Sequence, residues 1–399
     1  MSSAELSAGR ANDGTAGDGN AGFDEMSFVH LQVHSEYSIS DGLVRLPQLV
    51  TSIAENHMEA VAITDDSNLY AAVKFYKAAV KAGIKPIIGV ELTIETDEGG
   101  GAAGQLTLLC RNNTGYQFLC ELLTRAYLQR GTLHKIRVPR QHLVDGASGL
   151  IALSGGVEGE IGRLLLNGND HGAAVCLEQY REVFSDDNFF LEISRVGRPE
   201  DERHLELTLS LAGIHSAPVV ATNLVRFLGA DEFDAHEIRV CIHEGSRLGD
   251  PRRPRRFGRE QWLRSTSQMT SLFEDVPDAI ENAVQIARRC NVFLDLQGTH
   301  MPAFKGIEGE DTGERLKKDS RLGLVGRLQH EAPAGKVVRD EIPPNYLDRL
   351  NSEVETILSM GFADYFLVVA EFIHWAREQK IPVGPGRGSG AGSLVAWAL

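Results

Sequence analysis

From residue 28 to about residue 227, short apolar runs alternate with longer stretches in which apolar residues recur every three or four positions. The short runs are typical of buried strands and the longer stretches of amphipathic helices. The expected strands are residues 28–34, 60–64, 86–94, 105–110, 150–155, 188–194 and 218–222. The clearest expected helices are residues 46–57, 69–83 and 276–291. Strands joined by helical connections predict an α/β fold with a parallel sheet, either open or closed into a barrel.

The last hundred residues follow a different, mainly helical pattern. We place a domain boundary near residue 295, after which residues 347–358 and 362–373 carry apolar side chains at helical spacing. Residues 307–341 are highly charged and are expected to form an irregular, mobile surface segment with short helices. The sequence then predicts an apolar strand, a glycine-rich turn over 384–392 and a helix up to Leu399.

Composition narrows the class of protein. Residues 1–22 are small, polar and glycine-rich, which predicts a disordered tail. The net charge of -15 argues against a surface that is basic overall, as nucleic-acid platforms are, and the one dense basic stretch, 251–259, is expected to be a solvated loop. The five cysteines are scattered without a Cys-x-x-Cys pair, which fits a reducing compartment. No apolar run reaches the roughly 20 residues of a membrane span, and a soluble cytoplasmic protein is expected.

Polar residues gather at the ends of the first three expected strands. They are His34, Asp41, Asp65, Asp66 and Glu91. Imidazole and carboxylate groups together suit zinc, manganese or iron, although polar residues at strand ends also simply cap loops. The position that could share a metal with His34 is Gln32, whose neutral amide is a poor ligand for such a centre. This residue weakens the metal hypothesis.

The glycine-rich turn over 384–392 is the second candidate site. It fits neither the Walker A pattern nor the dinucleotide fingerprint, because no lysine follows the glycines and their spacing fails in every frame. A glycine turn before a helix, with Arg387, Ser389 and Ser393, is suited to binding phosphate, although a tight structural turn is the alternative. No Asp-x-Asp pair occurs to hold magnesium, so the turn is expected to be a substrate cradle without its catalytic partners.

Several stretches resemble one family. "FVHLQVHSEYSISDGL", "AVAITDDSNLYAAVKFYKAAVKAGIKPIIGVEL" and "MGFADYFLVVAEFIHWAREQKIPVGPGRGSGAGSLVAWAL" closely resemble the alpha subunits of bacterial replicative DNA polymerase III, the C family of polymerases. The resemblance covers about Phe28 to Leu399. It implies a PHP (polymerase and histidinol phosphatase) domain, a distorted (β/α)7 barrel, over residues 23–295. It also implies the start of a polymerase-beta-like α+β palm over residues 296–399, truncated before the catalytic aspartates.

The resemblance also implies roles for individual residues. In the palm, four residues are expected to bind the phosphates of the incoming deoxynucleoside triphosphate: Arg387, Gly388, Ser389 and Ser393. The two Mg²⁺ ions of such a polymerase would be held by residues beyond Leu399. In the barrel, most of the family's metal-binding histidines are replaced, by Gln32, Gln105, Val196 and Leu224 among others. The remaining members, His34, Asp41, Asp65 and Glu91, are expected to form a vestigial site in which Arg226 takes the place of the metal.

The function implied by the resemblance is DNA-directed 5′–3′ DNA synthesis in the full-length protein, with this chain alone inactive. The PHP domain is expected to dock the proofreading exonuclease (epsilon) subunit. The sliding clamp, the clamp loader and primed DNA would bind regions beyond this chain. The alternative hypothesis is an active metal-dependent phosphoesterase or an intrinsic 3′–5′ exonuclease in the barrel.

Overall fold

The computed structural model describes residues 28–95, 104–129, 136–296, 298, 301–306, 309, 311–331, 342–384, 386 and 388–399. The chain divides into two compact units, the first ending at Leu294 and the second beginning at Asp295. The expected tail over residues 1–22 lies outside the described residues.

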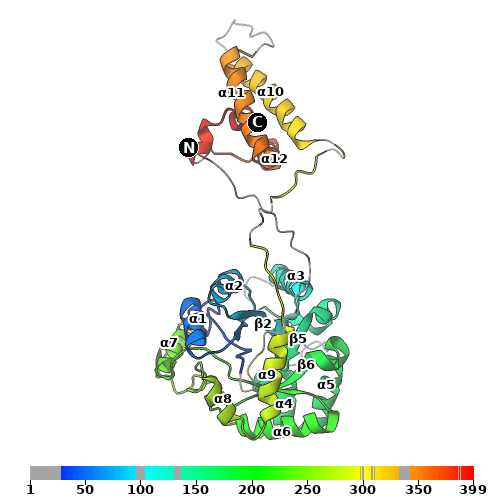
Figure 1. Cartoon of the computed structure of the whole chain (residues 1–399), viewed down its shortest axis with the longest axis vertical. Helices are drawn as coiled ribbons and strands as arrows, with labels where there is room; N and C mark the ends of the chain where they lie inside the picture. Colours follow the sequence, from blue (N-terminus) through cyan, green and yellow to red (C-terminus); the bar gives the residue numbers. More distant parts are fainter. Residues whose placement is uncertain are drawn as a thin grey trace, which may run out of the picture. The chain divides into compact units, whose positions relative to one another are not determined.

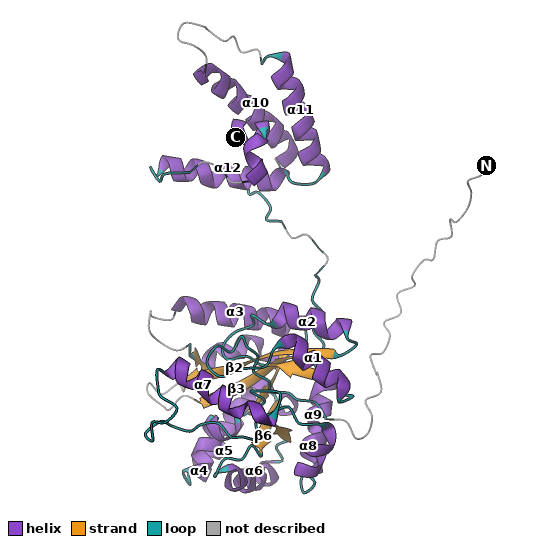
Figure 2. Cartoon of the chain, turned by 90° about the vertical axis from the view of Figure 1, so that its left-hand side faces the viewer, coloured by secondary structure: helices purple, strands orange, loops and turns teal. Residues whose placement is uncertain are grey.

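The first unit is built around one sheet surrounded by helices (Figures 1 and 2). Its strands are β1 (Ala60–Ile63), β2 (Lys85–Glu95), β3 (Gly104–Cys110), β4 (Val138–Pro139), β5 (Leu150–Leu153), β6 (Phe189–Ser194) and β7 (Val219–Thr222). They lie in the order β1-β2-β3-β5-β6-β7, with β4 paired to β2. Its α-helices are α1 (Leu46–Glu55), α2 (Ala72–Lys81), α3 (Asn113–Gln129), α4 (Glu160–Leu166), α5 (Asp170–Phe184), α6 (Asp201–His215), α7 (Phe233–Glu244), α8 (Thr266–Leu272) and α9 (Pro277–Arg289).

The direction of β3 differs from the predicted parallel sheet. β3 runs antiparallel to both of its neighbours, β2 and β5, whereas β1–β2, β5–β6 and β6–β7 are parallel. The physical reason is the short connection from Glu95 to Gly104, because a parallel crossover needs about a dozen residues or more. β4 was not predicted, since two residues are too few to leave a periodic pattern.

The segment over residues 28–35 closes the sheet, although it was expected to be a regular strand. It is extended and makes isolated bridges to different neighbours, His30 with Val61 and Val33 with Val225. Its backbone bonds to β1 on one side (Ala62 N–H to His30 carbonyl, 2.8 Å) and to residue 225 on the other (His34 N–H to Val225 carbonyl, 2.9 Å). Because residue 225 follows β7, these bonds connect the two ends of the sheet into a barrel.

The core of the first unit follows the predicted periodicities. The expected helices over 46–57, 69–83 and 276–291 are confirmed as α1, α2 and α9. In α2, for example, Ala72, Phe75, Tyr76 and Ala79 are buried, which is the spacing of one helical face. Full burial of a side chain such as Phe75 stabilises the fold by about 1.5–3 kcal/mol. The strands β1, β5, β6 and β7 are buried along their whole length, as expected for a sheet covered on both faces.

The second unit is helical over its described residues. Its helices are α10 (Thr312–Glu331), α11 (Pro344–Ser359), α12 (Ala363–Glu378) and α13 (Leu394–Ala398), with a 3-10 turn over Gly388–Gly392. The expected helices over 347–358 and 362–373 are confirmed as α11 and α12. Leu350, Val354, Ile357 and Leu367 pack with α13 in a separate apolar cluster.

Two expectations for this unit were wrong. Residues 312–331, expected to be irregular, form one continuous helix because Leu316, Ser320 and Leu324 recur every fourth residue and are fully buried. The expected strand before the glycine turn is not formed, since residues 381–384 are exposed and have no strand pairing. The described residues of this unit contain no β-strand.

No single helix among the described residues is long and apolar enough to cross a membrane. Only α11 and α12 taken together meet that test, and they are bent by 113° relative to each other.

Candidate functional site

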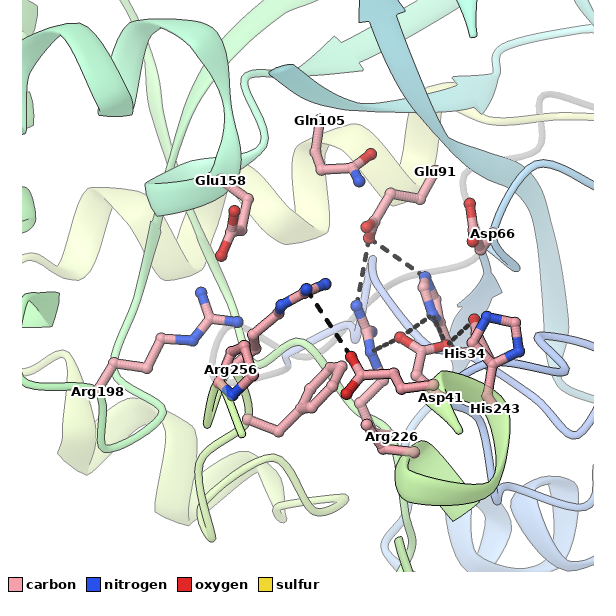
Figure 3. A pocket seen from close by; sticks show the side chains of 15 residues that line it. His34, Asp41, Asp66, Glu91, Gln105, Glu158, Arg198, Arg226, His243 and Arg256 are labelled. Carbon is pink, nitrogen blue, oxygen red and sulfur yellow. Dashed lines mark hydrogen bonds and ion pairs between the residues drawn. The ribbon is translucent and has the colours of Figure 1, made fainter. Parts of the chain in front are cut away.

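A cavity of about 500 Å³ in the first unit contains most of the polar residues predicted at the strand ends (Figure 3). His34 comes from the closing segment over 28–35, Asp41 from the loop that follows it, and Glu91 from β2. Arg226 lies four residues after the end of β7, next to Val225, which bonds to the closing segment. Barrel closure therefore brings together four charged side chains from three separate parts of the sequence.

His34 lies between two carboxylates. Its Nδ1 is 2.9 Å from Asp41 Oδ1, and its Nε2 is 3.2 Å from Glu91 Oε2, where the contact is close enough for an ion pair but not aligned as a hydrogen bond. Burial lowers the pKa of His34 and Arg226 lowers it further, but Asp41 and Glu91 outweigh both and raise this pKa to about 10. His34 is therefore an imidazolium ion at neutral pH, with no free lone pair.

Arg226 binds the same two carboxylates. Its Nε lies 2.9 Å from Asp41 Oδ2 and its terminal nitrogen 3.4 Å from Glu91 Oε2. Only 4% of the Arg226 surface is exposed. Figure 3 shows the guanidinium reaching Asp41 and Glu91 beside His34. Two cations and two anions thus form a neutral buried cluster, which we call the four-charge cluster: His34, Asp41, Glu91 and Arg226.

The two carboxylates of the four-charge cluster are held in their ionised forms. Burial raises the pKa of Glu91, but His34 and Arg226 outweigh this and lower the pKa to about 2. The same two cations hold the pKa of Asp41 well below its usual range against the effect of burial. Gln32 adds a hydrogen bond from its amide nitrogen to Glu91 Oε2 (2.7 Å). Each charge is therefore offset by a partner at contact distance.

A metal ion does not fit this arrangement. A zinc-type ion needs free histidine and carboxylate ligands, but both carboxylates already contact Arg226 and both ring nitrogens of His34 face those carboxylates. The guanidinium would also repel a divalent cation at this distance. Among the described residues, no group of three or more histidine, cysteine, aspartate or glutamate side chains is arranged to hold a metal.

Asp65 does not line the cavity with the other predicted residues. Its carboxylate accepts hydrogen bonds from the backbone N–H of Ser35 (2.6 Å) and from the hydroxyls of Ser35 and Ser38 (both 2.8 Å). It therefore fixes the loop that carries Asp41. The neighbouring Asp66 lines the cavity instead and accepts a hydrogen bond from Ser67 (2.9 Å). Burial raises the pKa of Asp66.

Sequence reasoning missed the other side of the cavity. It is lined by Glu158, Arg198, His243, Glu244 and Arg256, and Figure 3 shows Glu158 and Arg198 across the cavity from His34 and Asp66. His243 and Glu244 end α7, Glu158 ends a short 3-10 helix, and Arg198 and Arg256 lie in loops, so no shared periodic pattern marks them in the sequence. The only signal was the density of arginines over 251–259.

The basic stretch over 251–259 is more than a solvated loop. Pro254, Arg256 and Phe257 line the cavity, and Arg256 lies 3.8 Å from Glu244. Arg253 is buried and forms an ion pair with Glu237 on α7. The expected solvated loop is confirmed for most of the stretch, since residues 251, 252, 254–256 and 259 are exposed; Arg253 is the exception because it pairs with an acidic residue of the preceding helix.

A further carboxylate, Glu192 on β6, is fully buried inside the barrel. It accepts hydrogen bonds from the Thr222 hydroxyl (2.5 Å) and the Gly155 backbone N–H (3.1 Å). Burial raises the pKa of Glu192 to about 7, although the bond from Thr222 opposes this shift. Sequence reasoning did not identify Glu192, because an acidic residue inside an apolar strand leaves no pattern.

The glycine segment of the second unit, Gly388–Gly392, is the other predicted site. Arg387 and the side chain of Ser389 lie outside the described residues, whereas Gly388 adopts a φ of 71°, which favours glycine. Ser393 is the N-cap of α13, where its hydroxyl oxygen accepts from the Ala396 backbone N–H (3.1 Å) and donates to Glu353 Oε2 (2.9 Å). The Ser393 hydroxyl is therefore already bonded within the chain.

Comparisons with known proteins agree with this division into two parts. The PHP domain family matches residues 30–196, and the bacterial DNA polymerase III alpha NTPase domain family matches residues 316–399. The chain is 46% identical over 374 residues to a DNA polymerase III alpha subunit of Vibrio cholerae, covering 93% of this chain. It is 45% identical to that of Pseudomonas aeruginosa over 94% of this chain, and 46% identical to that of Escherichia coli K12 over 94%.

The relatives are much longer than this chain. The chain spans 32% of the length of each of these three curated relatives. Among solved structures, an amidohydrolase from Chromobacterium violaceum aligns with 53% of this chain and 97% of its own, at 14% identity and a TM-score of 0.35. A likeness of that strength carries nothing about the site.

Proposed function

Because this chain is a homologue of the bacterial DNA polymerase III alpha subunits and carries a PHP domain, we propose that it is part of a DNA-directed DNA polymerase. In the full-length protein the activity would be template-directed 5′–3′ transfer of nucleotides from deoxynucleoside triphosphates. The observation that carries this proposal is the 46% identity, which extends over both units of the chain.

The catalytic centre would need residues outside this sequence. Nucleotidyl transfer uses two Mg²⁺ ions held by paired carboxylates, and no Asp-x-Asp pair occurs in the sequence. We therefore expect the 399-residue chain to be inactive alone. Primer extension with magnesium and deoxynucleotides is the test: extension by the full-length protein supports the proposal, and extension by the 399-residue chain overturns the assignment of the missing ligands.

We assign the triphosphate to the glycine segment and its neighbours, Arg387, Gly388, Ser389 and Ser393. The support is a glycine turn with a positive φ followed by a capped helix start. Since Glu353 already bonds to Ser393, the contribution of Ser393 would be to shape the segment unless the nucleotide displaces Glu353. Replacing Arg387 by alanine in the full-length protein and measuring the use of nucleotide tests this assignment.

For the barrel we propose a structural role, with Arg226 standing in place of a metal and the PHP domain docking the proofreading exonuclease (epsilon) subunit. The support is the four-charge cluster, whose carboxylates are engaged by Arg226 and by a protonated His34. The sliding clamp, the clamp loader and primed DNA would bind elsewhere on the full-length protein. Such a protein would work in the cytoplasm.

The competing function is an active phosphoesterase or intrinsic 3′–5′ exonuclease in the barrel. It would need at least one metal ion bound among His34, Asp41, Glu91 and Asp66. We expect elemental analysis of the purified chain to find no stoichiometric zinc, manganese or iron. We also expect no chelator-sensitive hydrolysis of single-stranded DNA. One metal per chain together with such hydrolysis would restore the exonuclease hypothesis and remove the structural one.

A further inference from the structure

Both ends of α13 are held by charged side chains from neighbouring helices. At its amino end, Glu353 on α11 accepts hydrogen bonds from the Ser393 hydroxyl (2.9 Å) and the Val395 backbone N–H (3.1 Å). At its carboxyl end, Arg327 on α10 donates from Nε to the Trp397 carbonyl (2.9 Å). A carboxylate at the start of a helix and a guanidinium at its end both complement the helix dipole. We call Glu353 and Arg327 the α13 clamp.

Other contacts brace the clamp. Arg349, one turn before Glu353 on α11, donates from Nε to Glu353 Oε1 (2.5 Å) and from a terminal nitrogen to the Gly392 carbonyl (3.4 Å). Burial raises the pKa of Glu353, but the bond from Val395 and the bond from Arg349 lower it overall, so the carboxylate is ionised at neutral pH. Gly323 lets α10 approach closely, because a Cβ there would lie 2.1 Å from the Ala398 carbonyl oxygen.

The position of the glycine segment depends on α13. A helix of five residues does not persist on its own in water, so α13 stays in place only through its tertiary contacts. The glycine segment has little packing of its own, since a Cβ added at Gly388, Gly390 or Gly392 would meet nothing within 4 Å. Its link to the rest of the unit therefore runs through Gly392 and Ser393 into the clamped helix.

We propose that Glu353 is a positioning residue for the nucleotide site, which acts through α13 and does not touch the nucleotide. By fixing the amino end of α13, it sets the place at which the Gly388–Gly392 backbone meets the triphosphate. This inference rests on the proposed function of the glycine segment. Glu353 has no motif around it that would mark it in the sequence; only the fold brings it to Ser393 and Val395.

The test uses the full-length polymerase and three variants on α11. Glu353→Ala removes the bonds that the carboxylate accepts from Ser393 and Val395. We expect the KM for deoxynucleotide to rise about tenfold, as for the loss of a charge-assisted hydrogen bond. The changes in kcat and in primer–template affinity should be smaller. Glu353→Gln keeps an acceptor oxygen and should fall between Ala and wild type. Glu355→Ala removes the same charge from an exposed position on the same helix and should leave KM unchanged.

The outcomes separate the two levels of inference. If wild-type full-length protein does not extend a primer, the proposed function fails. If the wild type extends and Glu353→Ala keeps its KM, the positioning role is overturned. An equal loss in kcat, KM and DNA affinity would also overturn it, because that result indicates general disruption of the unit.

A second measurement does not depend on activity. In the 399-residue chain, hydrogen exchange of the peptide covering 394–399 should become about tenfold faster in Glu353→Ala, since Val395 loses its acceptor and α13 its anchor. Glu355→Ala should exchange like the wild type. Unchanged exchange in Glu353→Ala would remove the clamp and with it the proposal.

Discussion

The barrel residues were predicted as a vestigial metal site and the glycine segment of the second unit as a phosphate site, and the two regions differ in how their polar groups are used. In the barrel, His34, Asp41, Glu91 and Arg226 are buried and neutralise one another at contact distance. In the second unit, the backbone over 388–392 is exposed and its glycines have open space around them. The charges of the cluster are balanced by partners within the chain, whereas the glycines of the second unit leave their backbone exposed. Residue types that suit a ligand therefore indicate a binding site only where their polar groups are not already paired with other groups of the same chain.

The largest expected effect breaks the cluster. Arg226→Ala leaves Asp41 and Glu91 buried with one cation fewer, and we expect the barrel to lose about 3–5 kcal/mol of unfolding free energy, as for the removal of one partner of a buried ion pair. Chemical denaturation of the 399-residue chain measures this loss. The matched control is Arg198→Ala: Arg198 lines the same cavity and forms no ion pair with the described residues, so its loss should cost about 1 kcal/mol or less.

A second variant keeps this prediction testable if Arg226→Ala does not fold. Adding Glu91→Gln removes one of the uncompensated charges, so the double variant should recover part of the lost stability. If Arg226→Ala is as stable as Arg198→Ala, the guanidinium does not stand in for a metal. If added zinc restores stability to Arg226→Ala, His34, Asp41 and Glu91 can still bind a metal ion once the guanidinium is removed. That result would sharpen the comparison.

The next effect concerns Glu192, a fully buried carboxylate with no cation at contact distance among the described residues. Its pKa is about 7 in the folded chain and about 4.5 when unfolded, so the unfolded state releases the proton first as pH rises. Its contribution to stability is therefore present below about pH 4.5 and lost through about pH 7. Glu192→Gln lacks this titration.

We expect the stability of Glu192→Gln relative to wild type to increase between pH 4.5 and pH 8 by at most about 3 kcal/mol, at 1.36 kcal/mol per pKa unit. His34 and Glu91 titrate in both proteins and cancel in this difference. Urea unfolding at several pH values measures it. If the difference in unfolding free energy between Glu192→Gln and wild type does not change with pH, the pKa of Glu192 is not raised by burial. Glu192 would then resemble the paired carboxylates of the cluster.

The smallest effect concerns the open segment. In the full-length protein we expect Arg387→Ala to lower kcat/KM for deoxynucleotide ten- to hundred-fold, since a charge-assisted phosphate contact contributes about 1.5–3 kcal/mol. Binding of duplex DNA should stay nearly unchanged. Arg377→Ala, an exposed arginine on α12, is the matched control. An unchanged efficiency with nucleotide would remove Arg387 from the proposed site.

Much of the fold could be predicted from the sequence, because buried strands and one-sided helices such as α2 and α9 leave periodic patterns. The direction of β3 could not, since periodicity is the same for parallel and antiparallel strands, and only the short connection before it carried the information. In α10, a narrow stripe of Leu316, Ser320 and Leu324 was hidden by the charged residues around it.

The sequence identified several residues of the candidate site but not how they are arranged. His34, Asp41 and Glu91 were identified by residue type and place along the strands. Asp65 and Asp66 are adjacent, so nothing in the sequence says which of them enters the cavity; the serines at 35 and 38 decide it by binding Asp65. Glu158 and Arg198 come from loops, where position depends on the whole barrel and not on local pattern.

The closing segment over 28–35 has a consequence for synthesis of the protein. It is among the first described residues of the chain, yet its bonds to Val225 can form only after β7 has been made. During translation, at about 5–20 residues per second, residues 28–35 therefore stay without a partner on the side that later faces residue 225 until most of the barrel has been made. Closure joins residues far apart in sequence, which is intrinsically slow. A nascent barrel that is still open exposes the edge of residues 28–35 that will later pair with residue 225, so this segment needs protection from aggregation until β7 has been made.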